Sequence, residues 1–266
     1  MELTTLYVDE PLVLKRAVDI AKPSGAAKST ALFYVHGGGW NGGSRDQFHS
    51  HLAYFSSRGY WCGSAGYRLA PAADWKQQLS DASEAYMAFL HDLECQGQPV
   101  QRVIVLGSSA GAHLASLLAM MPPDRLPVQR TDRHAVWRQP DACVSINGPG
   151  TLEEWPDMNE RIRDCIEQAV GCSYADSDRG EAFAEASPIA YVGQGCPSFL
   201  FLLAEHEQYF PHAHVYAMSE SIRRHGGAAE TVLIEGAEHG FFYGLTSPEQ
   251  RQALRVLEAW LERQHV

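Results

Sequence analysis

Short apolar runs alternate with amphipathic stretches along most of the chain. Turn residues bound the apolar runs, as expected of buried strands, at 31–35, 60–67, 102–106, 142–146, 198–203 and 230–235. Helical periodicity covers the stretches at 74–94, 110–121, 212–225 and 248–264. Because strands alternate with helices of this length, we expect a mostly parallel sheet with helices on both faces. The predicted fold class is α/β.

Two parts of the chain depart from this alternation. Residues 6–8 and 12–20 predict a pair of antiparallel strands joined by a turn at 9–11. Residues 150–192 form a longer excursion between two predicted strands, and the segment 153–170 within it has a helical pattern. No internal repeat, low-complexity tract or long linker interrupts the chain. We therefore expect a single domain over all 266 residues, with the excursion as an inserted cover.

Two helix starts are marked by polar residues that can act as caps. Ser44 precedes a stretch that carries Phe48, Leu52 and Phe55 on one face, which predicts a capped amphipathic helix. Asp74 stands in the same kind of position before the long helical stretch that follows.

The composition is that of an ordinary globular protein, with 45% hydrophobic and 20% charged residues. The formal net charge of −11 and the lack of a Lys/Arg run make nucleic acid and anionic membranes poor partners. The N-terminus lacks the pattern of a signal peptide, and no apolar run reaches the ~18 residues of a membrane span. Six scattered cysteines form no CxxC pair: Cys62, Cys95, Cys143, Cys165, Cys172 and Cys196. We expect them to be buried, reduced thiols, which suits a cytoplasmic protein.

The segment GSSAG at 107–111 directly follows the apolar run at 102–106 and precedes a helical stretch. In a G-x-S-x-G turn the central serine takes a strained backbone conformation, and the flanking glycines leave room for the neighbouring strand and helix. Ser109 has glycine two residues before and two after it, whereas Ser108 does not. The nitrogen of Ala110 would then point at the site from a helix N-terminus, where negative charge is favoured. Ser109 is the candidate nucleophile, and an inert turn serine is the alternative.

The segment HGGGW at 36–40 directly follows the predicted strand at 31–35. Three consecutive glycines lose much chain entropy on folding, so they usually serve a close approach of the backbone. Acyl transfer needs donors aimed at the oxyanion, and such glycines can present successive N–H groups. A plain loop is the alternative. His36 is expected to support this loop through hydrogen bonds rather than to act as a base.

HGGGW, YRLAP at 67–71 and GSSAG, in this order, resemble the motifs of the esterase and lipase branch of the α/β-hydrolase superfamily. Within it the chain resembles hormone-sensitive-lipase-like enzymes and small acetyl and feruloyl esterases, from about residue 28 onward. The resemblance implies an α/β-hydrolase fold with oxyanion donors at Gly38, Gly39 and Ala110. Only 35 residues precede His36, so we expect the long N-terminal cap of the hormone-sensitive-lipase-like enzymes to be absent. The site should then be more open, or covered by the inserted segment.

In this fold the acid and then the histidine of a catalytic triad follow the serine along the chain. His239 comes just after the last predicted strand, beside Gly240, where a loop can place it over the serine. For the acid, the family pattern is a glycine, two residues, an aspartate, and a proline four residues further on. The chain reads AEHEQYFP there, which places Glu207 at the acid position and Pro211 at the proline. Glutamate can orient and stabilise an imidazole as aspartate does, and Glu205 is the rival.

Other residues have expected roles outside the triad. His113, on the helix after the serine, is expected to be a packing residue. Aromatic residues on loops after strand ends are expected to form an apolar, substrate-binding rim: Trp40, Trp155 and Phe241, together with Phe242 and Tyr209. No H-E-x-x-H, His cluster, acidic metal motif, G-x-G-x-x-G or P-loop occurs, so we expect neither a metal nor a cofactor.

Together with the resemblance, these residues indicate a serine carboxylesterase for short-chain, acetyl-like esters. Ser109 would attack the ester carbonyl and form an acyl-enzyme, with His239 as general base and Glu207 orienting it. Two alternatives stay open: an aryl-formamidase that cleaves amides of the N-formylkynurenine type, and a hydrolase fold that only binds. The complete Ser–Glu–His set argues against the second. The expected partner is a small-molecule ester, and the oligomeric state is open, with a homodimer as one option.

Overall fold

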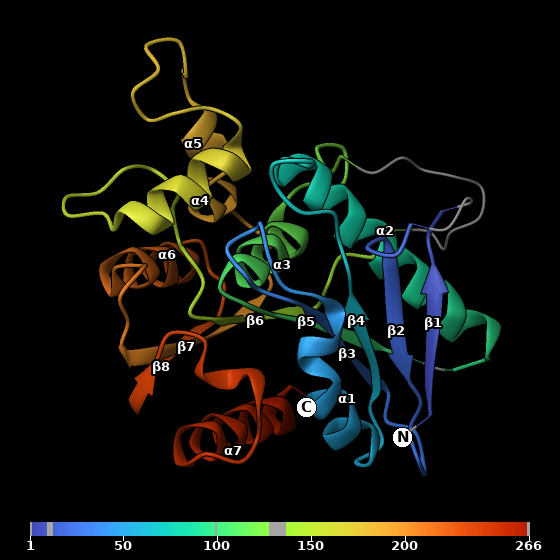
Figure 1. Ribbon diagram of the computed structural model, residues 1–266. Coiled ribbons are helices and arrows are strands. Elements are labelled where there is room, and N and C mark those ends of the chain that lie inside the picture. The colour runs from blue at the N-terminus through green and yellow to red at the C-terminus, as the bar shows by residue number, and fades with distance from the viewer. Residues whose placement is uncertain (1, 10–12, 99, 128–136, 265–266) are drawn as a thin grey trace.

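The computed structural model describes all residues except 1, 10–12, 99, 128–136 and 265–266. Among the described residues, the centre of the molecule is an eight-stranded sheet in the order β1-β2-β4-β3-β5-β6-β7-β8 (Figure 1). The strands are β1 (Leu3–Tyr7), β2 (Ala17–Ala21), β3 (Thr30–Val35), β4 (Trp61–Ala65), β5 (Arg102–Ser108), β6 (Ala142–Ile146), β7 (Ser198–His206) and β8 (Ala229–Glu238). Strand β2 pairs antiparallel with β1 and β4, and all pairs from β4 to β8 are parallel.

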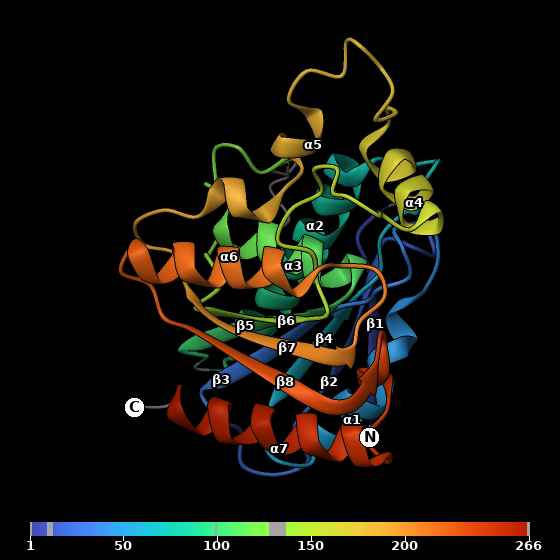
Figure 2. The same ribbon diagram turned by 90° about the vertical axis from the view of Figure 1, so that its left-hand side faces the viewer.

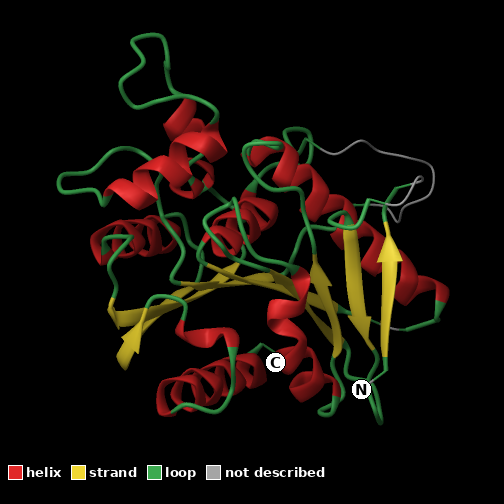
Figure 3. Ribbon diagram, in the orientation of Figure 1, coloured by secondary structure: helices red, strands yellow, loops and turns green. Residues whose placement is uncertain are grey.

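Helices cover both faces of this sheet. On one face lie α2 (Trp75–Cys95), α3 (Ala110–Met120) and α6 (His212–Arg224), and on the other α1 (His49–Ser56) and α7 (Pro248–Arg263) (Figures 1 and 2). Figure 3 shows the strands in yellow between these two layers of helices. The predicted α/β class, with a mostly parallel sheet covered on both faces, is confirmed, and the fold is that of an α/β-hydrolase.

The alternation of side chains along β3 explains how one strand serves two cores. Ala31, Phe33 and Val35 belong to the cluster under α2 and α3, whereas Leu32 and Tyr34 belong to the cluster under α1 and α7. All five residues are fully buried. Because successive side chains of a strand point to opposite faces, a strand covered on both sides has no polar face. This is why the sequence shows a continuous apolar run at this position.

The two N-terminal strands form the expected antiparallel pair, but their bounds differ from the prediction. Residues 6–8 and 12–20 were expected to be strands, whereas β1 ends at Tyr7 and β2 begins at Ala17. The predicted turn at 9–11 lies partly outside the described residues. Val13 and Leu14, whose apolar character favoured a strand, lie in the connection and are 37% and 71% exposed.

The two predicted helix caps have different outcomes. Asp74 is confirmed, because its side chain accepts a hydrogen bond from the Gln77 N–H at 2.8 Å in a reciprocal capping box that starts α2. Ser44 does not cap: its hydroxyl donates to the Asp46 carboxylate, and a 3₁₀ turn, η1 (Arg45–Phe48), precedes α1. The apolar face predicted for this stretch is buried as expected, at Phe48, Leu52 and Phe55.

The excursion at 150–192 lies between β6 and β7, beyond the helix layer that contains α3 and α6 (Figures 1 and 2). It carries α4 (Glu160–Val170), α5 (Ala182–Glu185) and a 3₁₀ turn, η2 (Pro188–Tyr191). The helix predicted at 153–170 was too long at its start. Asp157 has a positive φ of 58°, which ends any helix, and the side chain of Asn159 caps α4 by accepting from the Arg161 N–H at 2.9 Å.

All six cysteines are free thiols, as predicted. Burial was predicted too widely, because only Cys62 and Cys143 are buried and Cys95 is exposed. None of the helices in the described ranges combines the length and the apolar character that crossing a membrane requires.

Candidate active site

The predicted site residues follow the carboxyl ends of four parallel strands. The HGGGW segment at 36–40 follows β3, Ser109 follows β5, Glu207 follows β7 and His239 follows β8. From β3 the chain continues to β4 on one side, while β5 lies on the other side, so the strand order reverses between β3 and β5. In open α/β sheets, ligands bind at such a reversal, outside the carboxyl ends of the strands.

The turn at Ser109 has the geometry of a nucleophile elbow. Ser109 has φ 54° and ψ −121°, a strained conformation that non-glycine residues rarely adopt. A Cβ on Gly107 would clash with the carbonyl of Gly111, and a Cβ on Gly111 would clash with the carbonyl oxygens of Val35 and His36. Both glycines are therefore required for strand, turn and helix to pack this closely.

The two adjacent serines differ in access to the site. Ser109 is 6% exposed and lines a cleft at the ends of the strands. Ser108 is fully buried, pairs in register with Ile146 of β6, and is not part of the cleft lining. Only Ser109 therefore presents its hydroxyl where a substrate can reach it.

Ser109, His239 and Glu207 form one chain of hydrogen bonds. The Nε2 atom of His239 lies 2.8 Å from the Ser109 Oγ, and its Nδ1 atom lies 2.9 and 2.8 Å from the two carboxylate oxygens of Glu207. An ionised carboxylate only accepts hydrogen bonds, so Nδ1 carries the proton and Nε2 is free to accept from the serine hydroxyl. This is the arrangement of a serine, a general base and an orienting acid.

The carboxylate of Glu207 is held in place from two sides. Its side chain is 5% exposed, and it accepts a hydrogen bond from the backbone N–H of Tyr209 at 2.8 Å. Burial raises the pKa of Glu207. The hydrogen bond and charge of His239, together with the backbone N–H groups, lower this pKa by a larger amount, so the net pKa lies below its usual value. The rival Glu205 is 44% exposed and accepts from the Gly236 N–H at 2.8 Å instead.

The glycines of HGGGW form a tight loop beside Ser109. Gly38 and Gly39 have φ values of 120° and 59°, and the Gly42 N–H donates to the Gly38 carbonyl at 2.8 Å. A Cβ on Gly38 would meet the carbonyl of Gly42 at 2.5 Å, so only glycine fits there. Both glycines line the cleft, and Ala110 begins α3, where N–H groups have no partner within the helix. Gly38 and Gly39 thus line the same cleft as Ser109, and Ala110 directly follows Ser109 at the start of α3.

His36 is placed to support this loop. It is fully buried, its Nδ1 donates to the Gly37 carbonyl at 2.8 Å, and its ring stacks on Tyr67 at 4.1 Å between centroids. The Tyr67 hydroxyl donates to the His36 carbonyl at 2.8 Å. Burial lowers the pKa of His36 to about 4, so the ring is neutral at pH 7. The expectation that it is a support rather than a base agrees with these contacts.

The cleft above Ser109 has a volume of about 770 Å³. Its lining comes from the HGGGW loop, from α4 and from the loops around His239, namely Gly38, Gly39, Asn41, Gly42, Gln47, Ser109, Arg161, Ile162, Asp164, Cys165, Gln168, Tyr209, His239, Gly240 and Tyr243. Among the described residues of this lining, Ile162 alone has a pure hydrocarbon side chain. Most of the lining side chains therefore carry a polar group, although their carbon atoms also contribute apolar surface.

The sequence did not point to two parts of this lining. Tyr243 lies against the elbow, where a Cβ on Gly37 would clash with its hydroxyl oxygen and with the carbonyl of Ser108. The aromatic run after His239 was a signal for this residue. The second part is the polar face of α4. Its residues recur at helical spacing in the sequence, but the sequence does not show that this face lines the cleft, because that depends on how α4 packs.

Trp40 does not lie at the rim of the cleft, which corrects the expectation from the sequence. The side chain is fully buried, and its Nε1 donates to the Nδ1 of His113 at 3.1 Å. The ring also packs edge-on against Phe210 at 6.4 Å. His113 is fully buried too and donates from Nε2 to the Ala186 carbonyl at 2.7 Å, so it packs as predicted. Trp40 is part of the support under the HGGGW loop.

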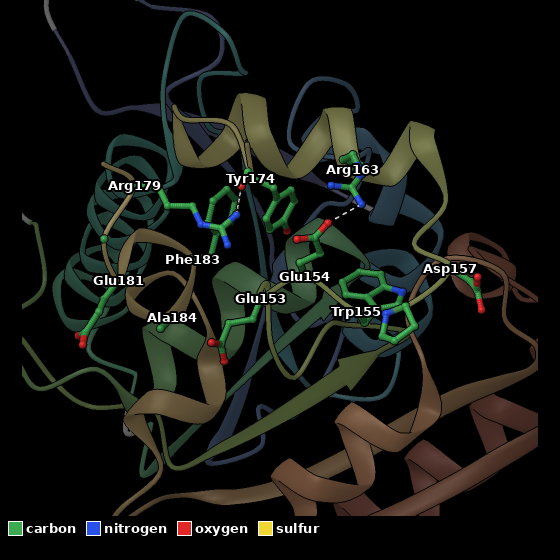
Figure 4. A pocket seen from close by; sticks show the side chains of 12 residues that line it. Glu153, Glu154, Trp155, Asp157, Arg163, Tyr174, Arg179, Glu181, Phe183 and Ala184 are labelled. Carbon is green, nitrogen blue, oxygen red and sulfur yellow. Dashed lines mark hydrogen bonds and ion pairs between the residues drawn. The ribbon is translucent and has the colours of Figure 1, made fainter. Parts of the chain in front are cut away.

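The other aromatic residues predicted for the rim lie in three different parts of the structure: the cleft, the core and a separate pocket. Tyr209 lines the cleft and packs edge-on against His239 at 4.8 Å. Phe241 and Phe242 pack into the cluster under α7 instead. Trp155 is 8% exposed and lines a separate pocket of about 840 Å³ on the excursion (Figure 4). The structure thus does not bring Trp40, Trp155 or Phe241 into the lining of the cleft that holds Ser109.

The fold and this site define an α/β-hydrolase of the esterase and lipase branch, as the motifs predicted. The chain belongs to the BD-FAE family, whose family model matches residues 18–222.

Curated relatives are esterases that are longer than this chain. Esterase LipQ of Mycobacterium tuberculosis is 27% identical over 216 residues, which cover 80% of this chain and 51% of LipQ. Esterase LipC of the same organism is 29% identical over 249 residues, 89% of this chain and 59% of LipC. The chain thus spans between half and three fifths of the length of these relatives.

Solved esterase structures share the fold over nearly the whole chain. Propionate-bound esterase Est2 of Thermogutta terrifontis has a TM-score of 0.77 at 22% identity, with 98% of this chain and 93% of that chain covered. Esterase B of Lactobacillus rhamnosis has a TM-score of 0.78 at 20% identity, with 99% and 87% covered. At this level of identity the likeness establishes the fold.

Proposed function

We propose that this protein is a serine carboxylesterase that hydrolyses short-chain acyl esters through an acyl-enzyme. The observation that carries the proposal is the hydrogen-bonded chain of Ser109, His239 and Glu207 at a cleft large enough for a small ester. The names of the curated relatives LipQ and LipC support ester hydrolysis as the reaction. A protein that only binds has no need for this complete set.

Each group has a defined part in the proposed reaction. The Ser109 Oγ attacks the ester carbonyl while the Nε2 of His239 takes its proton, and Glu207 stabilises the imidazolium that forms. The N–H groups of Gly38, Gly39 and Ala110 would stabilise the oxyanion of the tetrahedral intermediate. The alcohol leaves with the proton from His239. Water, deprotonated by the same imidazole, then releases the acid and restores Ser109.

The lining of the cleft favours short acyl groups. Among the described lining residues, Ile162 has the one aliphatic side chain and is only 6% exposed, whereas Asn41, Arg161 and Asp164 carry polar groups. Each additional methylene contributes ~0.8 kcal/mol to binding only if it is buried against apolar atoms. A long acyl chain would find no continuous aliphatic wall among the described lining residues of this open cleft. Chain length therefore adds little beyond a few carbons.

With a series of p-nitrophenyl esters, we expect the highest kcat/KM at acetyl to butyryl and a clear fall by octanoyl. Initial rates below substrate saturation give this profile directly. A preference for decanoyl or longer esters would show that the acyl group enters an apolar tunnel and would rule out the short-acyl proposal.

The same three residues could also cleave an amide, as in an aryl-formamidase. Running N-formylkynurenine beside the esters separates the two activities. We expect the short esters to have the higher kcat/KM. The opposite order would move the proposal to amide hydrolysis while keeping the same nucleophile.

Full activity is expected after exhaustive dialysis against EDTA, because the serine, the base and the backbone donors supply the chemistry of the proposed reaction. Within the described ranges, no three His, Cys, Asp or Glu side chains come together as metal ligands. Residual rates with p-nitrophenyl acetate, measured before and after dialysis, test this. A loss of activity that zinc or calcium restores would contradict the proposed mechanism.

Three further expectations belong to the same proposal. The partner is a small-molecule ester, which the names of the relatives support. The six free thiols favour a reducing compartment and hence a cytoplasmic location. The homodimer stays a prediction that size-exclusion chromatography with light scattering would test.

A further inference from the structure

One wall of the cleft is the polar face of α4. Arg161, Asp164, Cys165 and Gln168 all line the cleft, and their spacing of i, i+3, i+4 and i+7 places them on one side of the helix. The core-facing residues Ile166 and Ala169 are fully buried. An otherwise ordinary amphipathic helix thus turns its polar side towards the candidate nucleophile as well as towards solvent.

This face is attached directly to the HGGGW loop. The Asn41 Nδ2 donates to the Gln168 Oε1 at 3.3 Å and contacts the Cys165 Sγ at 3.7 Å. A Cβ on Gly39 would lie 3.2 Å from the same sulfur atom. The face of α4 that carries Arg161 and Asp164 therefore lies beside the loop that is proposed to hold the oxyanion, and both residues line the same cleft as Ser109.

This face carries two opposite charges, Arg161 and Asp164. Within the described part of the chain, the side chains of Arg161 and Asp164 make no hydrogen bond and no ion pair, and both residues are exposed. Burial raises the pKa of the Cys165 thiol, on which Arg161 and Asp164 act in opposite directions, so both charges are close to this cleft residue. Arg163 on the same helix differs, because it pairs with Glu154 at 2.7 Å in the other pocket (Figure 4).

We propose that Arg161 and Asp164 form a subsite for the carboxylate and the ammonium of an amino-acid head group. Arg161 offers paired N–H donors that match a carboxylate, and Asp164 accepts from an ammonium. A substrate with a single charge would be attracted by one of these residues and repelled by the other, one helical turn away. A zwitterion satisfies both. Resting on the proposed esterase function, this assigns acyl esters of hydroxy-amino acids as the substrate class.

The test uses four acetyl esters that differ only in the charge of the head group. These are O-acetylserine, its methyl ester, its N-acetyl derivative and the neutral compound with both modifications. Acetate release is followed by proton NMR in mildly acidic buffer, with an enzyme-free blank to correct for acetyl migration. For the unaltered enzyme we expect kcat/KM to be about a hundredfold higher for the zwitterion than for the neutral ester, because two charge-assisted contacts contribute about tenfold each.

Variants then separate the two charges. Arg161→Gln is expected to lower, about tenfold, the ratio of kcat/KM for the zwitterion to that for its methyl ester, which lacks the carboxylate. Asp164→Asn is expected to lower the ratio of the zwitterion to the N-acetyl derivative, which lacks the ammonium. Arg163→Gln is the matched control on the same helix, and both ratios should stay at their original values.

Each outcome has a definite meaning. Hydrolysis of all four esters with equal kcat/KM overturns the subsite but leaves the proposed esterase function standing. Ratios that change as much in Arg163→Gln as in Arg161→Gln also overturn it, because the effect would then come from the general charge of α4. If no ester of any kind is hydrolysed, the proposed function fails and the subsite with it. Ratios are used because they are insensitive to differences in the active fraction between variants.

Discussion

Replacing Ser109 by alanine is expected to lower kcat for ester hydrolysis about 10⁶-fold, the loss typical of removing a serine nucleophile. The hydroxyl lies 2.8 Å from the Nε2 of His239 and lines the cleft, so its loss removes the oxygen that would form the acyl-enzyme. Initial rates with p-nitrophenyl acetate measure the effect. The positive φ at this position is strained for alanine as it is for serine, so the variant should fold normally.

Ser108→Ala is the matched control for this prediction. The Ser108 side chain is fully buried and does not line the cleft, so its hydroxyl cannot reach a substrate. We expect the variant to keep substantial activity. Should it lose as much activity as Ser109→Ala while keeping its thermal melting point, the assignment of the nucleophile would be wrong.

Glu207→Gln is expected to lower kcat about 10²–10⁴-fold, by analogy with the loss of the orienting acid in other triads. An amide can still hydrogen-bond to His239, but it carries no charge to stabilise the imidazolium, and it can favour the wrong tautomer. The lowered pKa of Glu207 keeps its carboxylate ionised at neutral pH, so the native enzyme has this charge available. The effect should appear in kcat with p-nitrophenyl acetate far more than in thermal stability.

Glu205→Gln provides the control two residues away. This carboxylate accepts from the Gly236 N–H, whereas the Nδ1 of His239 is bonded to Glu207, so replacing Glu205 should change kcat only slightly. A larger loss for Glu205→Gln than for Glu207→Gln would mean that Glu205 is the triad acid.

The local geometry around Ser109 could be predicted because it depends on residues close in sequence. Glycine is required at 107 and 111 by backbone atoms that any such strand–turn–helix brings together. The alternation of apolar runs and helical stretches likewise predicted the sequence of strands and helices along the chain. The position of His239 could be predicted in the same way, because it comes just after the last strand of the sheet.

The choice between Glu205 and Glu207 could not be made from the sequence alone. Both are glutamates near the end of β7, and the chain lacks the glycine and the aspartate of the family pattern. In the structure the pairing of β7 with β8 is irregular between Ala204 and His206. Such an irregularity redirects the following side chains, and it has no clear signal in a single sequence.

The aromatic rim was predicted poorly for a related reason. A ring on a loop after a strand can point into the cleft or into the core, and sequence position does not distinguish the two. Trp40 turns inward because His113 offers its Nε1 a buried acceptor. The face of α4 that lines the cleft was missed because its placement depends on contacts with Asn41, more than a hundred residues away in the sequence.

Peptide mapping after labelling with a fluorophosphonate shows which hydroxyl is the nucleophile. The activated serine oxygen attacks phosphorus and fluoride leaves, so one phosphonyl group stays on the reacting residue. We expect a single label on Ser109, no label in Ser109→Ala, and slower labelling in Glu207→Gln. A label on Ser108, or unchanged labelling of Ser109→Ala, would contradict the assignment of Ser109, His239 and Glu207 as the catalytic triad.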